Sequence, residues 1–255
     1  MKLIKRFSII LIFILVIIIY MSNIDNKIYY VALGDSLAEG IDPYGKTGYG
    51  YSDYVRKFLE HKNILENYTK KFAKKGHRIT DLIMDIENNK KMEIDNKKTT
   101  IKNALINADL VTISIGANDL FYKLGVNNLI FDIDNVENLY RYVDEIIIDM
   151  DKLIELIQKY CKEDIILVGY YNPLSNKKSL LARELEPIFM YINIKMTELA
   201  NKYDIYYVDI YQIFKENPEY LPNPLDIHPS NEGYEVISRE IISVIKQKIL
   251  KYVEL

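Results

Sequence analysis

The sequence predicts one α/β domain, a three-layer α/β/α sandwich with a central, mostly parallel five-stranded sheet. The chain has 255 residues, of which 49% are hydrophobic. That is enough for one domain with a large core and too few for two. Short apolar segments alternate with longer amphipathic ones, as βα units require. The short segments are mostly apolar throughout, as strands covered by helices on both faces should be.

Five segments have the length and the β-branched or aromatic composition of strands. The second of them carries the weakest signal. The predicted strands cover residues 29–33, 68–73, 110–115, 164–170 and 204–210. Because ligand sites of open parallel sheets form at the carboxyl ends of the strands, we expect the functional residues at those ends.

Two amphipathic helices fit between and after these strands. In the first, apolar residues recur every three or four positions over residues 139–157. In the second, apolar residues recur every four positions over residues 237–249, and Ser230, which precedes them, is the predicted N-cap. Cys161 continues the first apolar stripe, so we interpret it as a small core residue. As the only cysteine, it excludes an intrachain disulfide and a multi-cysteine metal site.

Residues 1–21 differ in kind from the rest of the chain. Three positive charges precede the apolar run FSIILIFILVIIIYM, a pattern typical of export. At about 1.5 Å per residue the run covers roughly 22 Å, less than the ~30 Å core of a bilayer, which favours a cleaved signal sequence. The following YMSNIDNK lacks the small residues of a cleavage site, which favours an uncleaved membrane anchor. Either alternative predicts that residues 22–27 are a linker and that residues 28–255 work outside the cytoplasm, anchored or secreted.

The charge pattern argues against a nucleic-acid partner. The net charge is −3, and it becomes −6 once the three basic residues at the start are set aside. Lysine runs such as KKGHR and NNKKMEIDNKK are interleaved with acids and amides, which indicates solvated surface. No grouping of histidine, aspartate and glutamate has metal-ligand spacing, so we predict neither a metal nor a cofactor.

Four short segments follow predicted strands and hold the parts that acyl transfer needs. They are GDSL (34–37) with Ser36, KKGHR with Gly76, GAND with Asn118, and DIHP (226–229) with His228. A serine hydroxyl needs a neighbouring imidazole to remove its proton. The Ser36 and Gly76 backbone N–H groups and the Asn118 side chain could stabilise the oxyanion, and a carboxylate would orient His228.

These four segments, in this order, resemble the sequence blocks of the GDSL, or SGNH, hydrolase family from about Tyr29 to the last helix. The resemblance implies the flavodoxin-like SGNH fold for residues 28–255, Ser36 as the nucleophile, Gly76 and Asn118 as oxyanion donors and His228 as the base. The segment VGYYNPL (168–174) also resembles extracellular lysophospholipase-like members.

One position departs from the family pattern. The family usually places its aspartate three residues before the histidine, where this chain has Leu225, and Asp226 lies two residues before His228. Either Asp226 orients His228 from a shifted backbone, or a main-chain carbonyl does so. Of the other histidines, we place His61 on the surface and regard His77 as a weaker candidate base.

Two other motifs compete with this interpretation. Residues 40–47, GIDPYGKT, match a phosphate loop, but the predicted strand ends at Leu33, well before the loop, and Pro43 lies inside it. We therefore predict no nucleotide partner. The α/β-hydrolase elbow GxSxG requires a glycine where this chain has Ala38, and it expects the serine in the middle of the chain.

The sequence thus predicts a serine esterase or lipase that hydrolyses lysophospholipid or other acyl esters through an acyl-enzyme. The apolar segment after Asn118, residues 120–133, favours lipid esters weakly, as one wall of an acyl site. Two alternatives stay open: an esterase that removes O-acetyl groups from polysaccharide or peptidoglycan, and a non-catalytic module that binds envelope glycans.

Overall fold

The computed structural model describes residues 27–94, 97–123, 136–175 and 180–250. The predicted signal or anchor at residues 1–21 and most of the linker at 22–27 lie outside these ranges. A single five-stranded sheet forms the centre, with all neighbouring strands parallel and the order β2-β1-β5-β6-β7. This is the flavodoxin-like order, so the predicted three-layer fold is confirmed. The strands are β1 (Ile28–Gly34), β2 (Leu65–Thr69), β5 (Leu110–Ser114), β6 (Asp164–Val168) and β7 (Tyr206–Val208).

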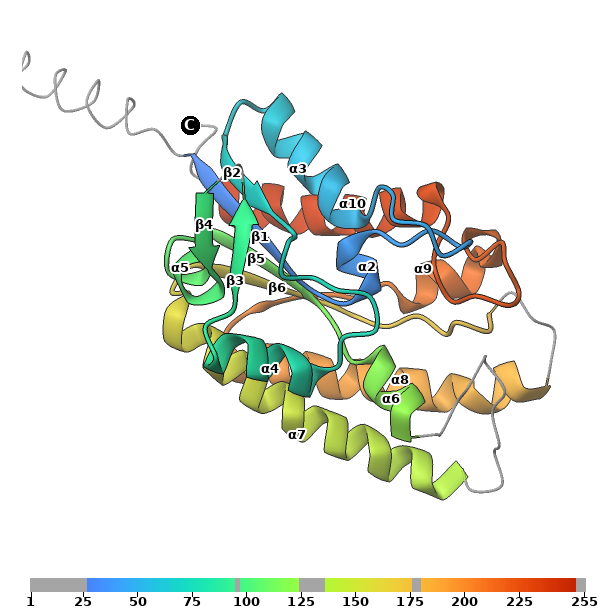
Figure 1. The fold of residues 1–255 in the computed structure, drawn as a ribbon. Coiled ribbons are helices and arrows are strands. Elements are labelled where there is room, and N and C mark those ends of the chain that lie inside the picture. The colour runs from blue at the N-terminus through green and yellow to red at the C-terminus, as the bar shows by residue number, and fades with distance from the viewer. Residues whose placement is uncertain (1–26, 95–96, 124–135, 176–179, 251–255) are drawn as a thin grey trace, which may run out of the picture.

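Helices cover both faces of the sheet (Figure 1). The side chains of β1, β5 and β6 divide between two buried clusters, one under each helical layer, which explains why these strands are apolar throughout. One layer holds α4 (Ile79–Glu87), α5 (Ile101–Ile106), α6 (Ala117–Lys123), α7 (Val136–Tyr160) and α8 (Leu180–Tyr203). The other holds α2 (Ser36–Glu39), α3 (Tyr51–His61), α9 (Tyr211–Glu216), η1 (Pro218–Tyr220), α10 (Asn231–Val244) and η2 (Ile245–Ile249).

Both helices expected from their periodicity are present. Most of the predicted apolar positions of α7 are buried, and Cys161, just beyond its end, is 1% exposed. The Ser230 hydroxyl accepts a hydrogen bond from the Gly233 N–H and so caps α10. The interpretation of Cys161 as a core residue is therefore confirmed.

The second predicted strand was placed too late in the sequence. We expected it at residues 68–73, whereas β2 is Leu65–Thr69. It is a half-exposed edge strand and therefore lacks an apolar run. The apolar pair Phe72 and Ala73, which suggested the strand, is buried in the turn that follows it.

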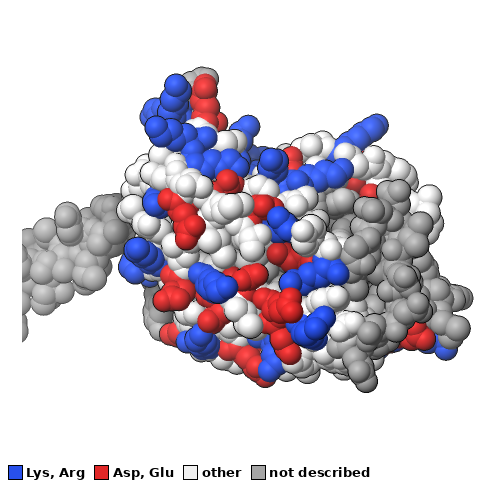
Figure 2. Space-filling view, turned by 60° about the horizontal axis from the view of Figure 1, so that its bottom comes forward, with Lys and Arg blue, Asp and Glu red and all other residues white. Residues whose placement is uncertain are grey.

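The lysine-rich run at residues 88–98 holds a hairpin that the sequence analysis missed. Strands β3 (Lys91–Ile94) and β4 (Lys97–Thr100) pair antiparallel and are largely exposed, apart from the buried Ile94. Elsewhere, on the face that carries α4 and α7, acidic and basic side chains are interspersed (Figure 2). The interpretation of these charges as solvated surface agrees with both observations.

Candidate active site

Ser36 lies at the point where the central strand β1 turns into α2. Gly34 ends β1 with a φ of +138°, and a Cβ at this position would lie 2.0 Å from the Ser114 carbonyl oxygen of β5. Only glycine permits that approach. Asp35 then caps α2, because its Oδ1 accepts a hydrogen bond from the Leu37 N–H at 3.1 Å. These two local requirements place Ser36 at the carboxyl edge of the sheet.

His228 and Asp226 reach Ser36 from the loop before α10. His228 Nε2 is 2.7 Å from Ser36 Oγ, and His228 Nδ1 is 2.5 Å from Asp226 Oδ1. The same carboxylate oxygen accepts the His228 backbone N–H at 2.8 Å. This tight turn is what allows an aspartate only two residues before the histidine to reach the ring. Leu225, at the family's usual aspartate position, is 84% exposed.

Asn118 links the residue after Gly76 to the residue before Ser36. Gly76 takes a left-handed conformation (φ +78°) in a turn closed by the hydrogen bond from the His77 N–H to the Lys74 carbonyl. Asn118 Nδ2 donates to the His77 carbonyl at 2.9 Å and to Asp35 Oδ2 at 3.3 Å. Within the described residues, the Ser36 and Gly76 backbone N–H groups have no acceptor. The longer Asn118 bond, to Asp35, is the one that an oxyanion could replace.

Two buried carboxyl groups hold this arrangement together. Burial raises the pKa of Asp35 to about 7, and burial raises the pKa of Asp119 to about 6. The Asp119 carboxylate accepts the Ile79 N–H, the first amide of α4, at 3.0 Å. It thereby ties the helix that follows the Gly76 turn to the helix that carries Asn118.

The other candidates do not join this cluster. His77 is buried, and its ring faces Asp85, with 3.7 Å between Nε2 and Oδ2, rather than Ser36. His61 is exposed at the end of α3, as predicted. Lys46 of the phosphate-loop match lies in an exposed loop between α2 and α3 instead of opening a helix, and β1 does not run into this loop. That geometry differs from a phosphate loop.

The comparisons with known proteins establish the family of the chain. The model of the GDSL-like lipase/acylhydrolase family matches residues 32–236, a range that contains all four segments. The chain belongs to this family. Membership supports the hydrolysis of esters in general and does not select a substrate.

Similar proteins include members with different substrates. The Bacillus subtilis (strain 168) protein YpmR, described as uncharacterized, is 26% identical over 228 residues, covering 88% of this chain and 83% of YpmR. The lipase Lip_vut3 from a goat rumen metagenome is 23% identical, with a TM-score of 0.65 over 85% of this chain and 97% of its own. Axe2, an acetylxylan esterase from Geobacillus stearothermophilus, is 20% identical, with a TM-score of 0.59 over 86% and 94%. These structural likenesses support the fold.

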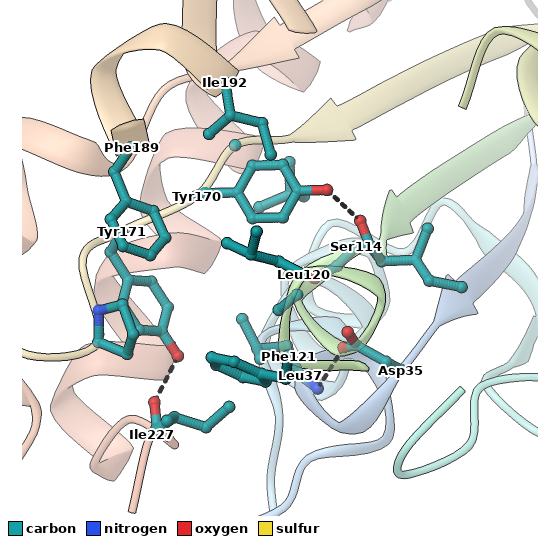
Figure 3. A pocket seen from close by; sticks show the side chains of 16 residues that line it. Asp35, Leu37, Ser114, Leu120, Phe121, Tyr170, Tyr171, Phe189, Ile192 and Ile227 are labelled. Atoms are coloured by element: carbon teal, nitrogen blue, oxygen red, sulfur yellow. Dashed lines mark hydrogen bonds between the residues drawn. The ribbon is translucent and has the colours of Figure 1, made fainter. Parts of the chain in front are cut away.

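An apolar pocket opens beside Ser36, and its full lining is not evident from the sequence. About 580 Å³ of space, including its open mouth, lies between the ends of β5 and β6 and the helices α6 and α8. Asp35, Leu37 and Ile227, the neighbours of Ser36 and His228, line one end, and Phe189 and Ile192 of α8 line the other (Figure 3). The Tyr171 hydroxyl donates to the Ile227 carbonyl at 2.7 Å and joins the pocket wall to the His228 loop.

The predicted acyl wall is present only in part. Leu120 and Phe121 line the pocket, whereas residues 124–133 lie outside the described residues. The segment 168–174, which resembles lysophospholipase-like members and had no predicted role, contributes Tyr170, Tyr171 and Pro173 to the wall. Phe189 and Ile192 resemble any other apolar helix positions in the sequence, so no sequence signal distinguishes them.

Burial also shapes the proton chemistry of the histidine. Burial lowers the pKa of His228, although the Asp226 carboxylate acts in the opposite direction. A neutral imidazole can accept a proton at Nε2 while its Nδ1–H donates to Asp226. The arrangement can therefore deprotonate Ser36 near neutral pH.

Proposed function

We propose that this chain is a serine esterase that hydrolyses acyl esters of the lysophospholipid type through an acyl-enzyme. The observation that carries the proposal is the continuous hydrogen-bonded path from Asp226 through His228 to Ser36, placed at the mouth of an apolar pocket. The path supplies an activated nucleophile, and the pocket supplies a place for an acyl chain.

The reaction would proceed in two halves. His228 Nε2 takes the proton of Ser36 as Oγ attacks the ester carbonyl, and the Asp226 carboxylate stabilises the resulting imidazolium. The oxyanion accepts hydrogen bonds from the Ser36 and Gly76 N–H groups and from Asn118. The C–O bond to the alcohol breaks, and the alcohol leaves with the proton from His228. Water, deprotonated by His228, then attacks the acyl-enzyme and releases the acid.

Fluorophosphonate labelling tests the proposal directly. The wild-type chain should be labelled at Ser36, and Ser36→Ala should lose the label and at least ~10⁴-fold in turnover. Ser175→Ala, a serine outside the site, serves as the control and should retain the label. A wild-type chain that stays unlabelled and inactive on esters would sink the proposal and favour a glycan-binding module.

The second candidate, removal of O-acetyl groups from an envelope polysaccharide, differs in the size of the acyl group. Rates on a series of p-nitrophenyl esters from acetate to palmitate separate the two. The apolar pocket leads us to expect higher kcat/KM for medium-length chains than for acetate. A strong preference for acetate would favour the second candidate.

The same proposal includes a site of action outside the cytoplasm, either anchored or secreted. It rests on the charged and apolar pattern of residues 1–21. Among the residues that the structure describes, from Lys27 onwards, none of the helices combines the length and the hydropathy of a membrane span. Protease treatment of intact cells should degrade the chain if its body lies outside, and protection of the chain until lysis would contradict this part.

A further inference from the structure

One aromatic side chain belongs both to the wall of the apolar pocket and to the support of the catalytic loop. Tyr171 lies just beyond the end of β6, is 7% exposed and lines the pocket together with Ile227 (Figure 3). Its hydroxyl donates to the Ile227 carbonyl at 2.7 Å. Ile227 is the single residue between Asp226 and His228. Tyr171 therefore contacts both the space for the acyl group and the backbone that carries the base.

The peptide between Ile227 and His228 decides whether Asp226 can serve the base. Asp226 Oδ1 accepts the His228 backbone N–H at 2.8 Å and lies 2.5 Å from His228 Nδ1. The carboxylate keeps both bonds only while this peptide has one orientation. Because a peptide is planar, the Ile227 carbonyl and the His228 N–H rotate as one unit. A donor that holds the carbonyl, such as the Tyr171 hydroxyl, therefore also holds the N–H.

The Tyr171 ring is held in place independently of its hydroxyl. It stacks on the ring of Phe214 in α9, with 4.4 Å between the centroids and 13° between the planes. Phe214 in turn meets Tyr220 edge-on, and the Tyr220 carbonyl accepts the Ser230 N–H at 2.8 Å, at the start of α10. Burial raises the pKa of the Tyr171 hydroxyl well above its usual range, so this group stays protonated and remains a donor.

The pocket links this support to the substrate. An acyl chain in the pocket packs against the Tyr171 ring and the Ile227 side chain, and it excludes water from the hydrogen bond between these two residues. An acetyl group is too short to fill the space of about 580 Å³, which includes the open mouth, and leaves both side chains uncovered. A longer chain should therefore restrict the turn, and with it His228, to the orientation that reaches Ser36.

We propose that Tyr171 is a positioning residue that couples the acyl pocket to the triad: through the Ile227 carbonyl it holds His228 towards Ser36, so that filling the pocket raises kcat. This inference rests on the proposed esterase function and adds to it a residue that sets acyl specificity through turnover. A pocket that only binds the chain would instead lower KM and leave kcat unchanged.

The test removes the hydroxyl alone and compares two acyl lengths. In the full-length wild-type chain, kcat should be about tenfold higher for p-nitrophenyl octanoate than for p-nitrophenyl acetate, the worth of one buried hydrogen bond. Tyr171→Phe should lower kcat for the octanoate about tenfold, leave its KM nearly unchanged and bring the two kcat values together.

Tyr203→Phe is the matched control. The Tyr203 hydroxyl also donates to a main-chain carbonyl, that of Asp151 at 3.2 Å. Tyr203 ends α8 before the start of β7, so it lies at the edge of the sheet opposite Ser36. This variant should keep the wild-type kcat for both esters. Circular dichroism checks that both variants are folded.

The pH profile separates the positioning of His228 from a general loss of stability. Burial lowers the pKa of His228, and the Asp226 carboxylate acts against this effect. A turn that is free to rotate weakens the Asp226 contribution, so Tyr171→Phe should lower the pKa of His228 and move the acid limb of kcat/KM to lower pH. Lys75 and Asp42, the other charged groups that act on His228, are unchanged in this variant.

Three results would overturn the coupling while esterase activity stands. They are equal kcat values for the two esters in the wild type, a loss in Tyr171→Phe that is confined to KM, and an acid limb that does not move.

Titration of His228 by nuclear magnetic resonance keeps the inference testable if turnover is absent. In the Ser36→Ala chain, adding Tyr171→Phe should lower the pKa of His228 and weaken the downfield resonance of its Nδ1–H, which bonds to Asp226. Octanol, a neutral probe of the pocket, should strengthen this resonance only while the Tyr171 hydroxyl is present. Identical spectra and pKa values with and without the hydroxyl would refute the positioning role.

Discussion

The two sides of the Ser36 edge are built in different ways. The side towards β5 and β6 consists of largely apolar side chains that come from two strand ends, α6, α8 and the His228 loop. The side towards β2 carries the turn at residues 74–77, in which Lys74 and Lys75 are exposed and the Lys75 backbone N–H donates to the Glu39 carboxylate. Substitutions on the first side should change which acyl group fits. Substitutions on the second side should change only the electrostatic environment of the base and the substrate.

The largest effect should come from the residues at the junction of the two sides. Asp226→Asn should lower kcat by about 10⁴-fold, because an amide cannot stabilise the His228 imidazolium or enforce its tautomer. Adding Leu225→Asp to this variant should not restore activity, because position 225 faces solvent. Steady-state kinetics measure both. Recovery of activity in the double variant would show that an aspartate at position 225, the family's usual position, can orient His228.

Asn118→Ala should have the next largest effect. Loss of one oxyanion donor should lower kcat by about 10²- to 10³-fold while KM changes little, since the hydrogen bond forms mainly in the transition state. Asn67→Ala, an exposed asparagine of β2, is the matched control. A fall confined to KM would assign Asn118 to substrate binding instead.

The apolar side can be tested by filling the pocket. Ile192→Phe should lower kcat/KM for octanoate esters about tenfold and leave acetate esters nearly unchanged, because the larger ring occupies the far end of the pocket. Ile194→Phe, on the same helix but 56% exposed, should change neither. Equal losses on both esters would indicate general distortion, and circular dichroism would reveal unfolding.

The charged side should produce the smallest effect, a shift of the pH profile. Because the pKa of His228 is lowered, kcat/KM should fall on the acid side only below pH 6.5, as the base becomes protonated. Lys75→Gln should move this limb to higher pH, because removal of a positive charge raises the pKa of His228. Asp42→Asn should move it to lower pH, because the Asp42 carboxylate raises that pKa. Shifts of the same sign would contradict the arrangement.

Much of the fold follows from local patterns. The strands β1, β5 and β6 lie where apolar runs predicted them, since they are buried on both faces and cannot carry polar residues. The edge strand β2 and the hairpin β3–β4 were misplaced or missed, because half-exposed strands lack that constraint. Phe72 was misleading in the opposite way, because an apolar residue buried in a turn resembles part of a strand in the sequence.

The sequence by itself determined the order of the chemical groups and the strand ends from which they project. It predicted Ser36, Gly76, Asn118 and His228 as site residues because each lies in a short segment of specific composition. The tertiary structure decided that Asp226 can reach His228, and which side of Ser36 is apolar and which is charged. The physical reason is that the pocket and the surroundings of Lys75 depend on strand order and on helix packing. Both bring together residues such as Ile192 and Ile227, or Gly45 and Lys75, that are far apart in the sequence.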